Sequence, residues 1–126
     1  MDLDLDGRVV AGGGIGRAIA LLLASLRARV FVADRSREGL ATLSAAYPDI
    51  CTWEVDLVDR AAAARWIVDV EQAAQTPIAV LVNNAGGSLG QVPRDLTEIS
   101  HADWDSIVDI NLNAAFALSG AMVPGM

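Results

Sequence analysis

The sequence of 126 residues contains no lysine, one cysteine and one histidine, and these shortages exclude several classes of protein. The single Cys51 cannot build an internal disulfide framework, and no group of cysteine and histidine has the spacing of metal ligands. All nine basic residues are arginine and sixteen residues are acidic, so the net charge is −7. This charge disfavours an electrostatic surface for nucleic acid. We therefore expect neither a bound metal nor a nucleic-acid partner.

Long apolar runs and targeting segments are also missing. No apolar stretch in the sequence approaches the ~18 residues that span a bilayer. Residues 1–6 alternate acidic and apolar residues, unlike a basic secretory or transit segment. These features predict a cytoplasmic protein with no membrane partner. Hydrophobic residues make up 53% of the chain, which favours a packed core, and the length fits one domain over residues 1–126.

Apolar runs alternate with helical patterns along the chain. Short runs predict strands at 8–11, 30–33, 51–55 and 79–83, and helical spacing predicts helices at 14–26, 36–46 and 59–74, with a loop over 84–99. Ser100 opens a last helix, and Asp103 three residues later completes a pattern similar to a capping box. Such alternation predicts an α/β fold, a doubly wound parallel sheet with helices on both faces. Ligands bind at the carboxyl ends of the strands in such sheets.

A glycine-rich turn follows the first predicted strand. Gly12-Gly13-Gly14-Ile15-Gly16 leads directly into a helix, and glycine permits both a tight turn and the close approach of a pyrophosphate. The helix N-terminus adds free N–H groups and partial positive charge. A merely flexible connection is the alternative explanation. The position after a strand favours phosphate binding.

Asp34 ends the second predicted strand, eighteen positions beyond Gly16. A carboxylate about 20 residues past the glycines is placed to bind the hydroxyls of the adenosine ribose, and it repels a 2′-phosphate. The spacing therefore favours NAD over NADP. Arg35 and Arg17 point the other way, because a guanidinium group accepts a 2′-phosphate. A solvated turn aspartate or a helix cap is the alternative for Asp34.

Polar residues also end the third and fourth predicted strands. Asp56 is placed to pair with an adenine amino group, and Asn83-Asn84 could hold neighbouring strands or a ribose. Ala85 and Gly86 are small enough for a cofactor to lie close to the backbone. Ordinary turn chemistry explains the glycines here but explains the paired asparagines less well.

Asn111 falls on the apolar stripe of the last helix, seven residues from both Trp104 and Leu118. A buried amide must be hydrogen-bonded or it costs ~1–3 kcal/mol. Two interpretations stand equally: a satisfied core asparagine, or an amide that holds a catalytic water or bends the helix locally.

These segments together resemble the short-chain dehydrogenase/reductase family over the whole chain. The matching segments are Gly14-Ile15-Gly16-Arg17-Ala18-Ile19-Ala20, Val32-Ala33-Asp34-Arg35, Val55-Asp56-Leu57, Leu81-Val82-Asn83-Asn84-Ala85-Gly86 and 104–116. The resemblance corresponds to the first half of a typical member. It implies a Rossmann-type sheet truncated after the fourth strand and the following helix.

The resemblance also implies a function. It implies hydride transfer between a nicotinamide cofactor and a small alcohol or ketone, in a homo-oligomer, with Asn111 as the family's catalytic asparagine. Residues 92–95 and the last helix look similar to 3-oxoacyl-acyl-carrier-protein reductases and to alcohol or sugar dehydrogenases. The implied cofactor-binding residues are Gly12, Gly14, Ile15, Gly16, Asp34, Arg35, Asp56, Leu57, Asn83, Ala85 and Gly86.

Two departures from the family pattern keep a second hypothesis open. About four residues of the usual Thr-Gly-x-x-x-Gly-x-Gly turn are absent, and the catalytic serine and Tyr-x-x-x-Lys pair have no match. Tyr47, in the region of the second predicted helix, is the only tyrosine, and His101, in the first turn of the last helix, is a poor substitute for a general acid. The alternative is a non-catalytic nucleotide-binding or oligomerisation module. A receiver domain is disfavoured because it requires a lysine.

Overall fold

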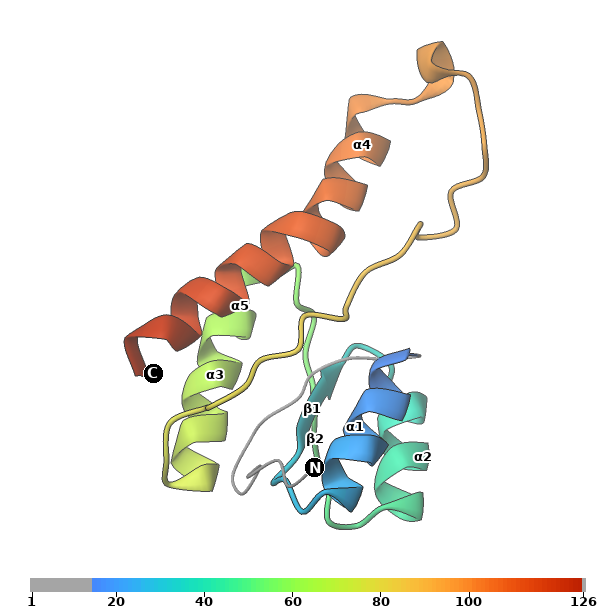
Figure 1. The fold of residues 1–126 in the computed structure, drawn as a ribbon. Coiled ribbons are helices and arrows are strands. Elements are labelled where there is room, and N and C mark those ends of the chain that lie inside the picture. Colours follow the sequence, from blue (N-terminus) through green and yellow to red (C-terminus); the bar gives the residue numbers. More distant parts are fainter. Residues whose placement is uncertain (1–14, 126) are drawn as a thin grey trace.

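The computed structural model describes residues 15–125 of the chain, and its helices lie on both sides of two central strands (Figure 1). The predicted first strand at 8–11 lies outside these residues, as do Gly12 and Gly14. The elements are α1 (Ile15–Ser25), β1 (Phe31–Asp34), α2 (Arg37–Ala46), β2 (Cys51–Glu54), α3 (Arg60–Ala74), α4 (His101–Val108) and α5 (Ala114–Met122), with a 3-10 turn at Leu96–Glu98, a π-helical turn at Asp109–Asn113 and a 3-10 turn at Val123–Gly125.

β1 and β2 pair in parallel, which confirms the α/β prediction. Phe31 lies opposite Cys51 and Asp34 lies opposite Glu54, so both strands end at the same edge. α2 connects them, as a parallel pair requires a crossover segment.

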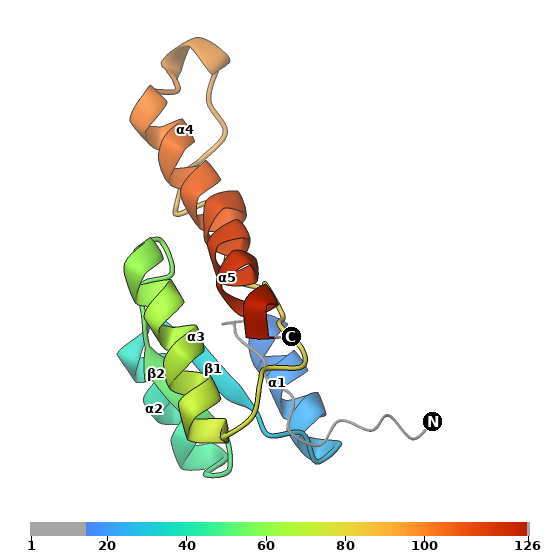
Figure 2. The same cartoon turned by 90° about the vertical axis from the view of Figure 1, so that its left-hand side faces the viewer.

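The side chains of β1 alternate between two hydrophobic cores, one on each face of the sheet. Phe31 and Ala33 join the core under α3 and α5, while Val30 and Val32 join the core under α1 and α2. All four are buried, as the continuous apolar run predicted. The two views agree on this layering (Figures 1 and 2).

Side chains cap three helices at the places where the sequence indicates a helix start. The Ser36 hydroxyl accepts a hydrogen bond from the Gly39 N–H at 3.1 Å, and Asp59 accepts one from the Ala62 N–H at 2.9 Å. Ser100 and Asp103 form the expected capping box at α4. Each cap satisfies an N–H that the first turn leaves without a helical partner.

The predicted fourth strand at 79–83 does not form a regular strand. Within the described residues, only Asn83 of this segment makes a β-bridge. In doubly wound sheets the fourth strand pairs with the first. The residues expected to supply that partner, 8–11, lie outside the described part of the chain.

The last helical segment extends beyond the rest of the domain. α4, the π-helical turn and α5 follow one another from His101 to Met122, and α4 extends away from the rest of the molecule (Figures 1 and 2). By length and composition alone, the helix His101–Gly125 is long and apolar enough to cross a membrane, since an 18-residue window within it has a mean hydropathy of 1.4. The expectation from apolar runs is corrected on this point. Ala114, Leu118 and Met122 are nevertheless buried in the core shared with α3.

The predicted apolar stripe of this helix holds only in its second half. Leu118 and Met122 are buried, but Asn111 is exposed and Trp104 is 62% exposed. The prediction of a buried Asn111 is therefore wrong. Two structural features explain it: α4 projects beyond the sheet, and the π-helical turn inserts one extra residue that shifts the faces of the helix.

Candidate nucleotide-binding site

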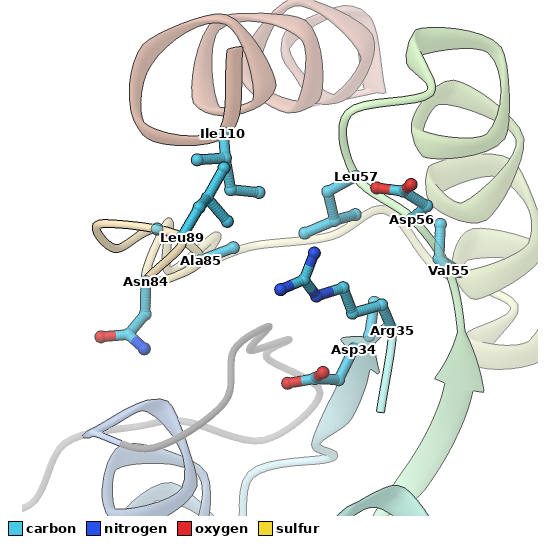
Figure 3. Close-up of a pocket in the computed structure, with 11 residues that line it drawn as sticks. Asp34, Arg35, Val55, Asp56, Leu57, Asn84, Ala85, Leu89 and Ile110 are labelled. Carbon is cyan, nitrogen blue, oxygen red and sulfur yellow. The ribbon is translucent and has the colours of Figure 1, made fainter. Parts of the chain in front are cut away.

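A pocket lies at the carboxyl ends of β1 and β2, where the parallel sheet predicts a ligand site (Figure 3). It combines acidic, amide and apolar side chains from four segments far apart in sequence. The lining residues are Ala33, Asp34, Arg35, Val55, Asp56, Leu57, Asn84, Ala85, Gly86, Leu89 and Ile110.

Asp34 is fixed by the backbone that follows it. Its Oδ1 accepts a hydrogen bond from the Ser36 N–H at 2.8 Å, and Ser36 in turn caps α2. Among the described residues this bond engages only Oδ1, and the Asp34 side chain lines the pocket. The Arg35 side chain reaches into the same pocket toward Leu57 and Ala85 (Figure 3). A carboxylate and a guanidinium group therefore lie side by side at the end of β1.

Asp56 and Leu57 supply a second wall just beyond β2. The Asp56 carboxylate accepts a hydrogen bond from the Val58 N–H at 3.1 Å, which forms a tight turn before α3. Leu57 is buried and anchors this turn in the core under α3. The turn thus presents a polar group and an apolar group to the pocket from one rigid position.

Asn84 lies against the start of α1, where the glycine-rich turn ends. A Cβ added to Gly16 would lie 2.9 Å from Asn84 Nδ2, closer than real Cβ contacts allow. Figure 3 shows the amide of Asn84 directed toward α1. A side chain at position 16 would therefore displace the Asn84 amide from its present place.

Asn83 faces a different neighbour. Its Nδ2 donates to the Ser119 hydroxyl on α5 at 3.3 Å, and its side chain lines a small separate cavity beside α5. The structure does not bring Asn83 to the main pocket. Of the two adjacent asparagines, Asn84 lies at the pocket and Asn83 connects to the last helix.

Asn111 fixes the loop that follows the pocket. Its Oδ1 accepts from the Gly87 N–H at 2.9 Å and its Nδ2 donates to the Gly87 carbonyl at 2.9 Å, so it binds both backbone groups of one residue. A Cβ on Gly86 would lie 2.5 Å from Asn111 Oδ1. We call these contacts the Asn111 clamp.

The π-helical turn accounts for the orientation of this clamp. Across the turn the Ala114 N–H bonds to the Asp109 carbonyl, five residues back. A π-type turn leaves carbonyls without their usual partner four residues on. Nδ2 of Asn111 also donates to the Ile107 carbonyl at 2.9 Å, four residues earlier. The interpretation of Asn111 as an amide at a local irregularity of the helix agrees with this geometry.

A polar network ties the loop to the start of α4. Gln91 donates to Asp103 Oδ1 at 2.9 Å, and Arg94 contacts Asp103 Oδ2 at 3.3 Å and also Gln91. Hydrogen bonds from Ser100 and then Gln91, together with the charge of Arg94, hold the pKa of Asp103 below its usual value. The carboxylate form of Asp103 therefore stabilises both the helix cap and the loop.

Sequence reasoning missed part of this site. Leu89 and Ile110 line the pocket, and neither belongs to a recognisable strand-end motif. The only available sequence signal for Ile110 was that it directly precedes Asn111 in the last helix. His101 and Tyr47 are exposed and do not line the pocket. Among the described residues, no group of three or more His, Cys, Asp or Glu could hold a metal ion.

Parallel strands with helices on both faces, and a polar pocket at the strand ends, define a Rossmann-type α/β domain. A family model described as short chain dehydrogenase matches residues 9–126. The chain therefore belongs to the short-chain dehydrogenase family.

Individual relatives agree with this assignment. The chain is 33% identical to a 3-oxoacyl-acyl-carrier-protein reductase of Thermotoga maritima over 97% of its length and 51% of that protein. It is 38% identical to a galactitol 2-dehydrogenase of Rhizobium johnstonii over 94% of its length and 47% of that protein.

Solved structures show the same fold. A glucose/ribitol-type short-chain dehydrogenase/reductase from Brucella melitensis superposes with a TM-score of 0.85 at 30% identity, covering 99% of this chain and 55% of the other. An NADH-dependent reductase, A1-R′, solved with NAD, superposes with a TM-score of 0.83 at 28% identity, covering 99% and 54%. The chain thus spans about half the length of the relatives that it matches.

Proposed function

We propose that this chain forms the cofactor-binding half of an oxidoreductase that transfers a hydride between a nicotinamide dinucleotide and a small alcohol or ketone. The observation that carries the proposal is the pocket at the strand ends, where Asp34, Asp56 and Asn84 converge beside the small residues Ala85 and Gly86. Carboxylates suit ribose hydroxyls and an adenine amino group, and small residues let a dinucleotide lie against the backbone.

The preferred cofactor in this proposal is NAD. Asp34 is held in place by the Ser36 N–H, so a 2′-phosphate entering the pocket would meet its carboxylate. Arg35 opposes this preference, because its guanidinium group reaches into the same pocket. The charge of Asp34 is placed directly at the strand end, and we therefore expect NADPH to bind more weakly than NADH.

Calorimetric titration of the purified chain with NADH and NADPH tests the cofactor proposal. Asp34→Asn should weaken NADH binding by about tenfold or more, because hydrogen bonds to a charged group contribute ~1.5–3 kcal/mol, and it should narrow the preference over NADPH. Glu54→Gln is a matched control, since Glu54 pairs with Arg37 at the same sheet edge but does not line the pocket. Equal affinity of the unaltered chain for both cofactors would contradict the preference for NAD.

The catalytic contribution of these residues is restricted to Asn111 in this proposal. The family pattern also uses a serine and a Tyr-x-x-x-Lys pair, and the 126 residues contain no lysine. We therefore expect the chain to bind NADH without oxidising alcohols, which also fits the alternative of a non-catalytic nucleotide-binding module. Turnover of an alcohol by this chain alone would refute this assignment.

We further propose that the chain self-associates through an exposed apolar surface formed by α5 and the turns on either side of it. Leu112 and Phe116 are 64% and 80% exposed one turn apart, and Val123 continues the same apolar surface. Burial against a second copy would remove this surface from water. Sedimentation analysis should show an oligomer that Phe116→Ser shifts toward monomer, whereas a monomeric unaltered chain would contradict the proposal.

A further inference from the structure

Leu89 has a left-handed backbone beside the pocket, with φ of 51°. Among the described residues two other non-glycine residues, Arg27 and Gln75, have positive φ, and each follows the C-terminal turn of a helix, where this conformation is common. Leu89 and Gly90 are the two central residues of a β-turn that the Gln91 N–H closes on the Ser88 carbonyl at 2.9 Å, and both have positive φ. Asparagine or glycine usually occupies the position of Leu89 in such a turn. A left-handed residue with a Cβ is unfavourable, and such residues cluster at ligand-binding sites.

The surrounding backbone holds Leu89 in this conformation. Gly87, two residues earlier, has φ of 141° and is bound at both its N–H and its carbonyl by the Asn111 clamp. Gly90, the next residue, has φ of 79°. Two glycines that bend the chain thus flank Leu89, and one of them is fixed to the last helix.

The side chain of Leu89 completes an apolar wall of the pocket. Leu89 and Ile110 lie together on one side, and Asp34 lies across the pocket from them (Figure 3). Leu57 adds a third apolar side chain beside Asp56. A ligand in this pocket therefore meets carboxylates at its edges and aliphatic groups on its flat surface, which is the chemistry of a purine base with an exocyclic amino group.

We propose that Leu89 is a specificity-determining residue that covers the base of an adenine nucleotide, and that the Asn111 clamp holds it there. The inference rests on the proposed cofactor function and extends it to a residue in the loop after the clamp. Leu89 is 41% exposed, so a base placed against it would remove the remaining apolar surface from water.

Binding of two probes, AMP and NADH, tests the inference, because both carry the base and only NADH carries the nicotinamide. Leu89→Ala should weaken both by the same factor, about three- to tenfold, as expected for the loss of part of one buried leucine contact. Leu96→Ala is the control, since Leu96 lies in the same loop, is 81% exposed and does not line the pocket; it should leave both affinities unchanged.

Two outcomes would overturn the inference. If Leu89→Ala binds both probes with unchanged affinity, Leu89 does not contact the base. If Leu89→Ala loses affinity for NADH alone, Leu89 lies at the nicotinamide or substrate end instead. No binding of either probe to the unaltered chain overturns the proposed cofactor function itself. Leu89→Gly controls for folding: it lacks the side chain but tolerates positive φ, so it should bind as weakly as Leu89→Ala yet melt a few degrees higher.

Discussion

Gly86→Ala tests whether the Asn111 clamp is a specific contact of the folded protein. The new Cβ would lie 2.5 Å from Asn111 Oδ1 but 4.0 Å from the Asn111 Cα, so the side chain must move while the helix backbone need not. Movement of the amide breaks its three hydrogen bonds, to the Gly87 N–H, the Gly87 carbonyl and the Ile107 carbonyl. Gly86 itself does not have positive φ, so alanine suits its backbone.

The expected free energies follow from these contacts. Three hydrogen bonds at ~0.5–1.5 kcal/mol each, taken at the low end because Asn111 is exposed, amount to about 1.5–3 kcal/mol. Replacement of glycine returns ~0.4–1 kcal/mol through the unfolded chain. Gly86→Ala should therefore destabilise the protein by about 1–2 kcal/mol. In an Asn111→Ala background the obstacle is gone, and the same change should be neutral or slightly stabilising.

Urea unfolding of the four proteins in this double-mutant cycle, followed by tryptophan fluorescence, measures the coupling between residues 86 and 111. Gly120→Ala provides a control of opposite sign: an added Cβ meets nothing within 4 Å there, and the helical position should gain up to ~1 kcal/mol. An equal cost of Gly86→Ala with and without Asn111 would refute the reasoning, because the penalty would then not arise from the amide.

Three further predictions concern the core, the loop and the end of α3. In urea unfolding, Trp66→Phe should change the free energy of unfolding by less than ~1 kcal/mol, whereas Trp66→Ala should cost ~3–5 kcal/mol. The buried indole N–H has no hydrogen bond among the described residues, so its removal offsets the cost of the lost volume. A cost of Trp66→Phe near that of Trp66→Ala would show that the indole N–H has a partner. Asp103→Asn should destabilise the protein at neutral pH. The difference in stability between the two proteins should vanish as the pH falls below 3.8 through the lowered pKa of Asp103, because a carboxyl group with a depressed pKa stabilises the fold only while it is ionised. Thermal melting as a function of pH, with Asp105→Asn as the control, measures this pH dependence. Arg29→Ala should cost about 1 kcal/mol, because Arg29 donates to the Ala74 carbonyl at 2.7 Å at the end of α3, and a thermal melt with unchanged Tm would exclude that cap.

Local patterns allowed much of this fold to be predicted from the sequence. Helix starts at Ser36 and Ser100, the buried run before Asp34 and the parallel pairing follow from side chains near in sequence. The fourth strand was predicted at 79–83 from its apolar run, but among the described residues only Asn83 makes a β-bridge. A strand's ladder depends on a partner elsewhere in the chain, which a local pattern does not contain.

The last helix shows the limit of periodicity most directly. A regular repeat of 3.6 residues places Asn111 on the buried stripe, but one π-type turn moves it to a position where it binds the Gly87 backbone. The turn coincides with a contact between segments 24 residues apart, which no local pattern indicates. Leu89 was missed because it lines the pocket from a loop and belongs to no strand-end motif.

The pairing of glycines with amides changes how the glycine-rich turn should be tested. Gly16 faces Asn84 and Gly86 faces Asn111, each at a separation that admits no Cβ. Substitution of Gly16 would therefore move the Asn84 amide, which lines the pocket, even if no phosphate ever bound beside it. Loss of cofactor binding in such a variant cannot identify a phosphate site, whereas Asp34, which is held by one backbone N–H, can be changed to asparagine with little effect on packing. A substitution at Asp34 can consequently test cofactor affinity with the least effect on the stability of the fold.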